Sequence, residues 1–170
     1  MKSLQYQAHD EGDTQRLGKA LAEVLPDGIV VALVGTLGAG KTRLVQAVAA
    51  ASGVASKTVV SPTFVLLGQY QGNRSINHFD AYRLRDEEEF WELGPDDYFQ
   101  ETGLTFVEWA DRVEACLPAS RLVIRIAITG PESRHFDIDS PAGEHAKVLE
   151  QLKEVLGEQK TEDRRVKSEE

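Results

Sequence analysis

The sequence predicts an α/β fold with three layers, in which the sheet is parallel at its centre and has antiparallel edge strands. Short apolar runs alternate with segments of helical periodicity along most of the 170 residues. A glycine-rich loop at residues 35–42 joins one such run directly to a helix, as in parallel sheets. A turn-rich stretch at 71–74 separates two strand-like segments, which indicates an antiparallel hairpin at one edge.

The composition is typical of one soluble globular domain, which we place at residues 1–156. A formal net charge of −9 argues against this chain itself gripping a nucleic acid backbone. The single cysteine, Cys116, excludes an internal disulfide framework and a thiolate metal cluster. No apolar run is long enough for a membrane span, and the N-terminus has no apolar signal core, so we expect a cytoplasmic protein.

The first expected element is a helix that Asp13 caps and that ends before Pro26. A continuous apolar run at 29–34 then predicts a buried parallel strand. After the glycine-rich loop, apolar residues recur at helical spacing until Gly53, a residue suited to end a helix. The apolar stripe of the first helix consists of Leu17, Ala20, Leu21, Val24 and Leu25.

Residues 35–42 form a complete G-x-x-x-x-G-K-T phosphate-binding loop, with the strand before it and the helix after it that the motif requires. Its glycines let the backbone curl so that successive N–H groups face phosphate oxygens. Lys41 would reach the terminal phosphates and Thr42 would ligate Mg²⁺, whereas an ordinary turn needs neither residue. We therefore expect a P-loop that binds a nucleoside triphosphate. Its expected nucleotide-binding residues are Gly35, Leu37, Gly38, Ala39, Gly40, Lys41 and Thr42.

The rest of the chain predicts further strands and helices. The hairpin is expected to have strands at 63–70 and 75–80. A strand at 122–128 alternates in polarity and should bury chiefly one face. Residues 157–170 mix both charges with almost no apolar side chain, so we expect a charged, disordered tail. The other expected elements are a short helix from 86–89 that Gly94-Pro95 stops, a strand at 104–109, a helix through Leu117, a strand at 135–139, and a helix with Val148, Leu149, Leu152 and Leu156.

Two acids end predicted strands and are candidates for holding Mg²⁺ or ordering the attacking group. Glu108 ends an apolar run, and the carboxyl ends of parallel strands converge on the crevice where ligands bind. Asp80 ends the less apolar run of the hairpin. The alternative for Glu108 is a surface acid at a strand exit, and for Asp80 it is a cap of the following turn.

Two further features carry weaker signals. His78 shares one strand face with Asp80, but four scattered histidines without a partner cysteine argue against a transition-metal site. Ser61-Pro62-Thr63 follows the P-loop helix, where many P-loop proteins place a nucleotide-sensing switch. The same tripeptide is also typical of a plain turn, and both interpretations stay open.

Four separated segments resemble a known family when they are taken together and in order. They are GTLGAGKT at 35–42, Ser61-Pro62-Thr63-Phe64, HFDAYRL at 78–84, and Val107-Glu108-Trp109. On these motifs the chain resembles the TsaE (YjeE) family of small bacterial P-loop ATPases over roughly residues 10 to 136.

The resemblance implies a role in making threonylcarbamoyladenosine beside the anticodon of tRNA. In that pathway the family member acts with a TsaD–TsaB complex, in which TsaD performs the transfer. From the acidic charge balance we expect this chain to meet tRNA indirectly, through that complex. The family member supplies ATP binding and hydrolysis, which reset the complex between turnovers, and it hydrolyses ATP slowly by itself.

By position, the resemblance implies that Lys41 contacts phosphates and that Thr42 and Glu108 hold Mg²⁺. Thr14 lies where the family contacts the nucleotide base, and Arg134 falls near a late family arginine close to the nucleotide. The implied catalytic residues are Lys41, Asp80, Glu108 and Thr63, the last in the switch-like loop.

One position departs from the family. Thr36 stands where the family's loop usually has an acid after its first glycine. A carboxylate there would lie near the phosphates, so its replacement bears on metal geometry or intrinsic hydrolysis rate rather than on binding.

Two other functions fit a phosphate-binding loop. A small-molecule kinase typically needs an arginine-rich closing lid, and Arg74, Arg83 and Arg85 are only scattered around the hairpin. A GTPase would need an Asn-Lys-x-Asp motif to read guanine, which the sequence lacks. We therefore expect an ATPase whose nucleotide state switches its docking to partner proteins, with the kinase as the alternative.

Overall fold

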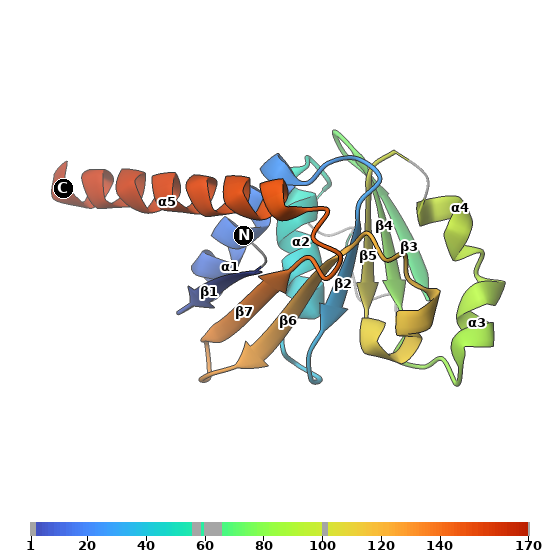
Figure 1. Ribbon diagram of the computed structural model, residues 1–170. Coiled ribbons are helices and arrows are strands. Elements are labelled where there is room, and N and C mark those ends of the chain that lie inside the picture. The colour runs from blue at the N-terminus through green and yellow to red at the C-terminus, as the bar shows by residue number, and fades with distance from the viewer. Residues whose placement is uncertain (1–2, 56–58, 60–65, 100–101, 170) are drawn as a thin grey trace.

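Figure 1 shows the computed structural model of the protein, which describes residues 3–55, 59, 66–99 and 102–169. Its strands are β1 (Ser3–Ala8), β2 (Val30–Val34), β3 (Leu67–Gln71), β4 (Ser75–Asp80), β5 (Leu104–Glu108), β6 (Leu122–Ile128) and β7 (Arg134–Asp139). Its helices are α1 (Glu11–Val24), α2 (Lys41–Ala51), α3 (Glu87–Glu92), α4 (Pro95–Phe99), the 3₁₀ helix η1 (Ala110–Cys116) and α5 (Ala146–Glu169).

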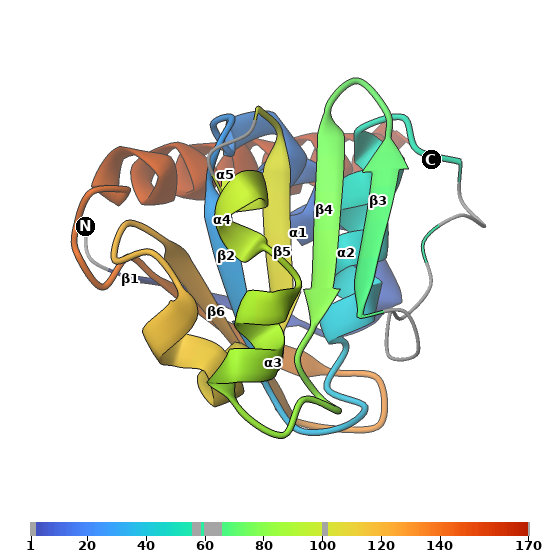
Figure 2. The same ribbon diagram turned by 90° about the vertical axis from the view of Figure 1, so that its right-hand side faces the viewer.

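All described strands lie in one sheet with the order β1-β7-β6-β2-β5-β4-β3. Helices α1, α2 and α5 cover one face, while α3, α4 and η1 lie against the other (Figures 1 and 2). β2 pairs in parallel with β5 and β6, and β4 pairs in parallel with β5. The edge pairs β1–β7, β7–β6 and β3–β4 are antiparallel. The predicted three-layer α/β fold, parallel in the centre and antiparallel at the edges, is therefore confirmed.

The edge strand β1 has no counterpart among the expected elements. It pairs with β7 along its whole length, from Ser3 opposite Asp139 to Ala8 opposite Arg134. Tyr6 and Ala8 are buried, whereas the residues between and before them are exposed or half-buried. A strand with so few inward positions gives only a short alternating pattern, which is why the sequence signal is weak.

The N-cap of helix α1 lies three residues before the predicted cap. Asp10 is the N-cap, and its carboxylate accepts a hydrogen bond from the Asp13 amide at 2.9 Å. Asp13 in turn accepts from the amide of His9 at 2.8 Å. The prediction of Asp13 as the cap is wrong because Asp10 is the N-cap. Asp13 resembles the second residue of a capping box, except that it accepts from the amide one residue before the cap.

Three other expected elements differ in the structure. Pro95 does stop α3, which ends at Glu92, but it also begins α4, since a proline in the first helical turn lacks only an N–H that would have no partner. The helix predicted through Leu117 is the 3₁₀ helix η1, with non-helical dihedral angles at Val113. Strand β3 starts at Leu67, and positions 63–65 of the predicted strand lie outside the described residues.

The core lies on both faces of the sheet. Helix α1 passes so close to α2 that a Cβ on Gly18 would lie 2.3 Å from the Cβ of Ala47. On the other face, the rings of Phe79 and Phe90 pack with centroids 5.5 Å apart. Because both faces are covered, the first three residues of β6 are all buried. The predicted alternation holds only at Arg125, Ile126 and Ala127, and it fails at Ile128, which is 48% exposed.

Helix α5 continues through Glu169, although we expected a disordered tail from residue 157. Its first half buries Val148, Leu149, Leu152 and Leu156 in the core, as predicted. Its second half is mostly exposed and reaches α1 through an ion pair of 2.9 Å between Arg16 and Asp163. No helix in the described part of the chain is long and apolar enough to cross a membrane.

Candidate nucleotide-binding site

The C-terminal ends of three neighbouring parallel strands meet at one edge of the sheet. β2 ends at Val34 and leads into the glycine-rich loop, after which α2 begins at Lys41. The pairing register sets Glu108 of β5 between Leu33 of β2 and Asp80 of β4. The loop and both candidate acids therefore lie where ligands bind in open parallel sheets.

The loop has the backbone geometry of an anion nest. Gly38 and Gly40 have φ angles of 78° and 105°, in the left-handed region that favours glycine. A Cβ on Gly35 would lie 2.8 Å from the carbonyl oxygen of Ile126, so the loop passes too close to β6 for a larger residue. Gly40 is the N-cap of α2, and no side chain of the described residues caps it. The first amides of this helix are therefore available to an anion.

Lys41 is buried at the mouth of the loop, with 5% of its surface exposed. Its Nζ donates to the carbonyl oxygens of Gly35 at 2.7 Å and Thr36 at 3.0 Å. Burial lowers the pKa of Lys41, and the nearby carboxylates of Glu108 and Asp80 oppose that shift. The ammonium is thus held by the loop itself, beside the amides of the nest.

Thr42 and Glu108 form the oxygen pair that the sequence predicts for a metal. Thr42 Oγ1 donates to Glu108 Oε1 at 2.6 Å, and Glu108 is only 3% exposed. Since this bond occupies the hydroxyl proton, the lone pairs of Thr42 Oγ1 remain for a cation. Carboxylate and hydroxyl oxygens are the hard ligands that Mg²⁺ prefers, so the donor set fits the expected ion.

Asp80 caps a turn, which is one of the two interpretations, and its catalytic role stays a prediction. Its Oδ1 accepts a hydrogen bond from the amide of Tyr82 at 2.8 Å, which caps the turn after β4. The same side chain also lines a cavity of about 350 Å³, together with Lys41, Thr42 and Glu108. A structural cap and a place in the site therefore coexist in one residue.

An aromatic cluster at this cavity has no role in the sequence-based predictions. The ring centroid of Trp109 lies 4.0 Å from Lys41 Nζ and 4.8 Å from the Tyr82 ring. Trp109 has a φ of 56°, a conformation that bulky residues rarely adopt. Arg112 donates to the Tyr82 carbonyl oxygen at 2.8 Å. Hydrophobic periodicity cannot reveal a residue that leaves its strand in this left-handed conformation; only its place after Glu108 marks it.

A second cavity, of about 520 Å³, contains the two remaining residues that the resemblance singles out. Thr14 of α1 and Arg134 of β7 line it, together with Gly38, Ala39 and Gly40 of the loop. Gly38 and Gly40 also line the first cavity, so the two cavities lie next to each other along the loop.

Arg134 contacts the loop rather than open space. Its Nε donates to the carbonyl oxygen of Ala39 at 3.0 Å, and its Nη2 donates to that of Gly38 at 3.4 Å. These bonds hold two loop carbonyls away from the nest, which leaves the N–H groups facing inward. The contact joins residues 95 positions apart in the sequence.

The structure adds little about two of the predicted site residues, Leu37 and Thr63. Leu37 lines the first cavity with its side chain largely in solvent, at 74% exposure. Thr63 lies outside the described residues, so its switch role stays a prediction.

Two of the three arginines that a kinase lid would use form ion pairs away from the site. Arg74 bonds Asp27, which precedes β2 at the opposite end of that strand, at 3.0 Å. Arg85 bonds Glu89 of α3 at 2.6 Å. Neither arginine is among the residues that line the two cavities.

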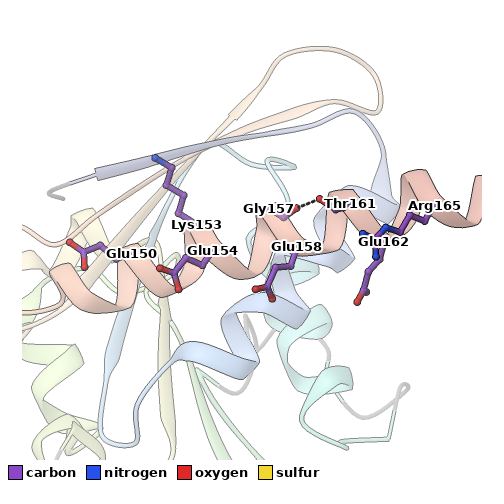
Figure 3. Close-up of a pocket in the computed structure, with 8 residues that line it drawn as sticks. All are labelled: Glu150, Lys153, Glu154, Gly157, Glu158, Thr161, Glu162 and Arg165. Atoms are coloured by element: carbon purple, nitrogen blue, oxygen red, sulfur yellow. Dashed lines mark hydrogen bonds between the residues drawn. The ribbon is translucent and has the colours of Figure 1, made fainter.

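A shallow hollow of about 780 Å³ lies far from this chemistry, along the outer side of α5 (Figure 3). All of its lining side chains belong to this one helix, so no groups from different elements converge on it. They are Glu150, Lys153, Glu154, Gly157, Glu158, Thr161, Glu162 and Arg165.

The family described as "Threonylcarbamoyl adenosine biosynthesis protein TsaE" matches residues 8–136 of the chain. The TsaE protein of Bacillus subtilis is 35% identical over 153 residues, covering 89% of this chain and 95% of its own. That of Treponema pallidum is 35% identical over 126 residues, covering 74% and 93% of the two chains. That of Haemophilus influenzae is 36% identical over 132 residues, covering 74% and 83%.

A solved structure has the same fold. The crystal structure of Bacillus subtilis YdiB superimposes with a TM-score of 0.78 at 30% sequence identity, covering 90% of this chain and 95% of that one. The family match spans the glycine-rich loop, both strand-end acids and Arg134, which are the residues that form the site. The chain therefore belongs to the TsaE family.

Proposed function

We propose that this protein binds ATP with Mg²⁺ and hydrolyses it as a component of tRNA threonylcarbamoyladenosine biosynthesis. The observation that carries the proposal is the convergence of Lys41, Thr42 and Glu108 at a loop with nest geometry. The pathway comes from the relatives, which are named tRNA threonylcarbamoyladenosine biosynthesis proteins.

In this proposal the loop amides and Lys41 hold the terminal phosphates of the nucleotide. Thr42 and Glu108 hold Mg²⁺, which when bound supplies neutralisation of phosphate charge. Asp80 completes the acidic side of the same cavity and acts in hydrolysis. Thr14 contacts the nucleotide base, and Arg134 keeps the loop carbonyls turned away from the phosphates.

We further propose that the protein acts with a TsaD–TsaB complex, resets it through ATP hydrolysis, and hydrolyses ATP slowly alone. Leu37 and Tyr82 expose apolar surface at the first cavity, so a partner that covers the nucleotide can bury both. The net charge of −9 supports contact with tRNA through the complex rather than directly.

Calorimetry with ATP and Mg²⁺ tests the first step, and we expect saturable heat from folded protein. Hydrolysis should release as much inorganic phosphate as ADP, whereas a kinase would leave phosphate on an acceptor. Absence of heat contradicts nucleotide binding, and phosphate on a metabolite contradicts the ATPase.

Pull-down with purified TsaD and TsaB, in ATP and in ADP, tests the coupling to partners. We expect capture that depends on which nucleotide is present, because the nucleotide state should change the surface around Leu37 and Tyr82. Equal capture in both nucleotides, or capture in neither, contradicts this part of the proposal.

A further inference from the structure

His78 is buried beside the candidate metal ligand, although the sequence suggests no role for it there. Its side chain is completely buried, and its Nε2 lies 2.7 Å from Glu108 Oε1. The same carboxylate oxygen accepts the hydroxyl proton of Thr42 at 2.6 Å. One oxygen atom therefore joins the loop helix α2, strand β5 and strand β4.

The pairing register of the sheet explains why His78 contacts Glu108. His78 pairs with Phe106 and Asp80 pairs with Glu108, so all four side chains lie on the same face of β4 and β5. His78 and Glu108 are diagonal neighbours on this face, within reach of a long side chain. The imidazole thus approaches the carboxylate from the protein interior, opposite to the cavity that Glu108 lines.

The hydrogen bonds assign the tautomer of His78. An ionised carboxylate only accepts hydrogen bonds, so the imidazole must donate from Nε2. Nδ1 is buried and has no hydrogen-bond partner in the part of the chain that the structure describes. A ring with its single N–H on Nε2 makes the bond to Glu108 without burying an unpaired donor at Nδ1.

We propose that His78 is a positioning residue that fixes the Glu108 carboxylate for the Mg²⁺ of the bound nucleotide. Its hydrogen bond to Oε1 comes from the protein interior. This bond keeps Oε1 within hydrogen-bond distance of the Thr42 hydroxyl and orients the Glu108 carboxylate toward the cavity. Without this bond, Glu108 would have other rotamers available, and the pair of oxygen ligands would no longer be preformed. The inference rests on the proposed function, because it concerns the metal of that site.

Three variants separate positioning from simple core packing. His78→Gln places an amide N–H near the position of Nε2, so it keeps a donor for Glu108. His78→Leu fills the space but removes the donor. Asn77→Ala is the matched control, because Asn77 is an equally buried neighbour on the opposite face of β4 and bonds Thr105 instead.

The first measurement is the affinity for ADP by calorimetry, with Mg²⁺ and with excess chelator. We expect His78→Leu to lose roughly tenfold or more of the Mg²⁺-dependent affinity while the affinity in chelator stays unchanged. His78→Gln should recover most of the loss, and Asn77→Ala should show none. Unchanged Mg²⁺ dependence in His78→Leu, or equal losses with and without Mg²⁺, would overturn the proposal.

The second measurement uses the wild-type protein, so it decides the matter even if His78→Leu does not fold. Nitrogen NMR of the histidine side chains should show His78 with its proton on Nε2, and Glu108→Ala should shift that signal. A proton on Nδ1, or a signal insensitive to Glu108→Ala, would refute the contact. Failure of the wild type to bind nucleotide at all would instead remove the proposed function and this inference with it.

Discussion

At the scale of single residues, the site depends on one buried ammonium. Lys41→Ala should weaken ATP binding by on the order of 1.5–3 kcal/mol, because a charge-assisted contact to the phosphates is lost. Isothermal titration calorimetry measures the change, and Lys153→Ala, an exposed lysine of α5, is the control. Normal affinity in Lys41→Ala would show that this ammonium does not contact the nucleotide.

The two acids should act more on hydrolysis than on binding. Glu108→Ala and Asp80→Ala are each expected to slow phosphate release by about 10²-fold or more. ATP affinity should change only a few-fold in Asp80→Ala, whereas Glu108→Ala should lose on the order of tenfold of the Mg²⁺-dependent affinity because it removes a metal ligand. The exposed Glu92 of α3 provides the control variant, Glu92→Ala. Unchanged turnover of either acid variant, measured in the presence of TsaD and TsaB, would remove that residue from the catalytic set.

Glu108→Ala should also reduce stability, unlike Glu92→Ala. It leaves the His78 Nε2 proton without its acceptor in a buried place and the Thr42 hydroxyl without its acceptor in a half-buried one. Each buried donor without a partner costs about 1–3 kcal/mol, so urea unfolding should show a loss in that range or above. A stability loss in Glu108→Ala therefore has to be separated from its catalytic effect, and the folded fraction should be measured first.

Residues that belong to local patterns could be predicted from the sequence, and those that depend on distant contacts could not. Lys41 and Thr42 are fixed by the spacing of the loop motif, and Glu108 by its place after an apolar run. The bond from Arg134 to Ala39 spans 95 positions and leaves no trace in either segment. The contact between Trp109 and Lys41 could not be predicted either. It depends on the left-handed backbone conformation of Trp109 itself, directly after β5.

At the scale of elements, Tyr6 joins β1 to α1 and makes their contact sensitive to pH. Its hydroxyl donates to the Asp13 carbonyl oxygen at 2.8 Å, and burial together with Asp13 raises the pKa of Tyr6 from 10.0 to about 12. A phenol whose pKa is raised on folding contributes stability below the unfolded pKa. That contribution is lost as the pH rises from 10 through about 12, because only the unfolded state ionises readily there.

Tyr6→Phe tests this contact. Below pH 10 the variant should be less stable by about 1 kcal/mol, the value of one hydrogen bond. As the pH approaches 12, the wild type should lose on the order of 2 kcal/mol relative to Tyr6→Phe, so its advantage disappears and then reverses. Urea unfolding of both proteins across this range gives the difference directly, and two parallel curves would refute the assignment.

Helices and strands could be predicted where a long hydrophobic periodicity or a continuous apolar run marks them. Strand β2, helix α2 and strand β5 have such signals, and the structure has all three. Strand β1 is short and lies at the sheet edge, and helix α4 is short and lies between turns. Strand pairing and packing, rather than a local sequence pattern, therefore determine whether they form. Helix η1 follows the left-handed Trp109, and it is too short, with non-helical dihedral angles at Val113, for a three-residue period to show in the sequence.

At the scale of the whole molecule, the sheet collects at one edge residues from segments far apart in the chain. Parallel strands β4, β2 and β5 must all end on that edge, because each returns through a connection on a face of the sheet. Once the glycine-rich loop is placed after β2, the acids at the ends of β4 and β5 are carried to it. This is why strand-end acids could be proposed from the sequence before their partners were known.

The exposed half of α5 allows a test of where the folded domain ends. Deleting residues 157–170 should change the free energy of unfolding by no more than about 1 kcal/mol, because the ion pair from Arg16 to Asp163 that it removes is nearly half exposed at each side chain. ATP affinity should stay unchanged, since neither cavity of the site contains a residue of α5. Leu152→Ala is the contrasting variant: it leaves the helix length intact but should cost about 2–5 kcal/mol by opening a hole in the core. If the deletion cost as much as Leu152→Ala, the second half of the helix would have to be part of the cooperative fold, and the domain would extend beyond residue 156.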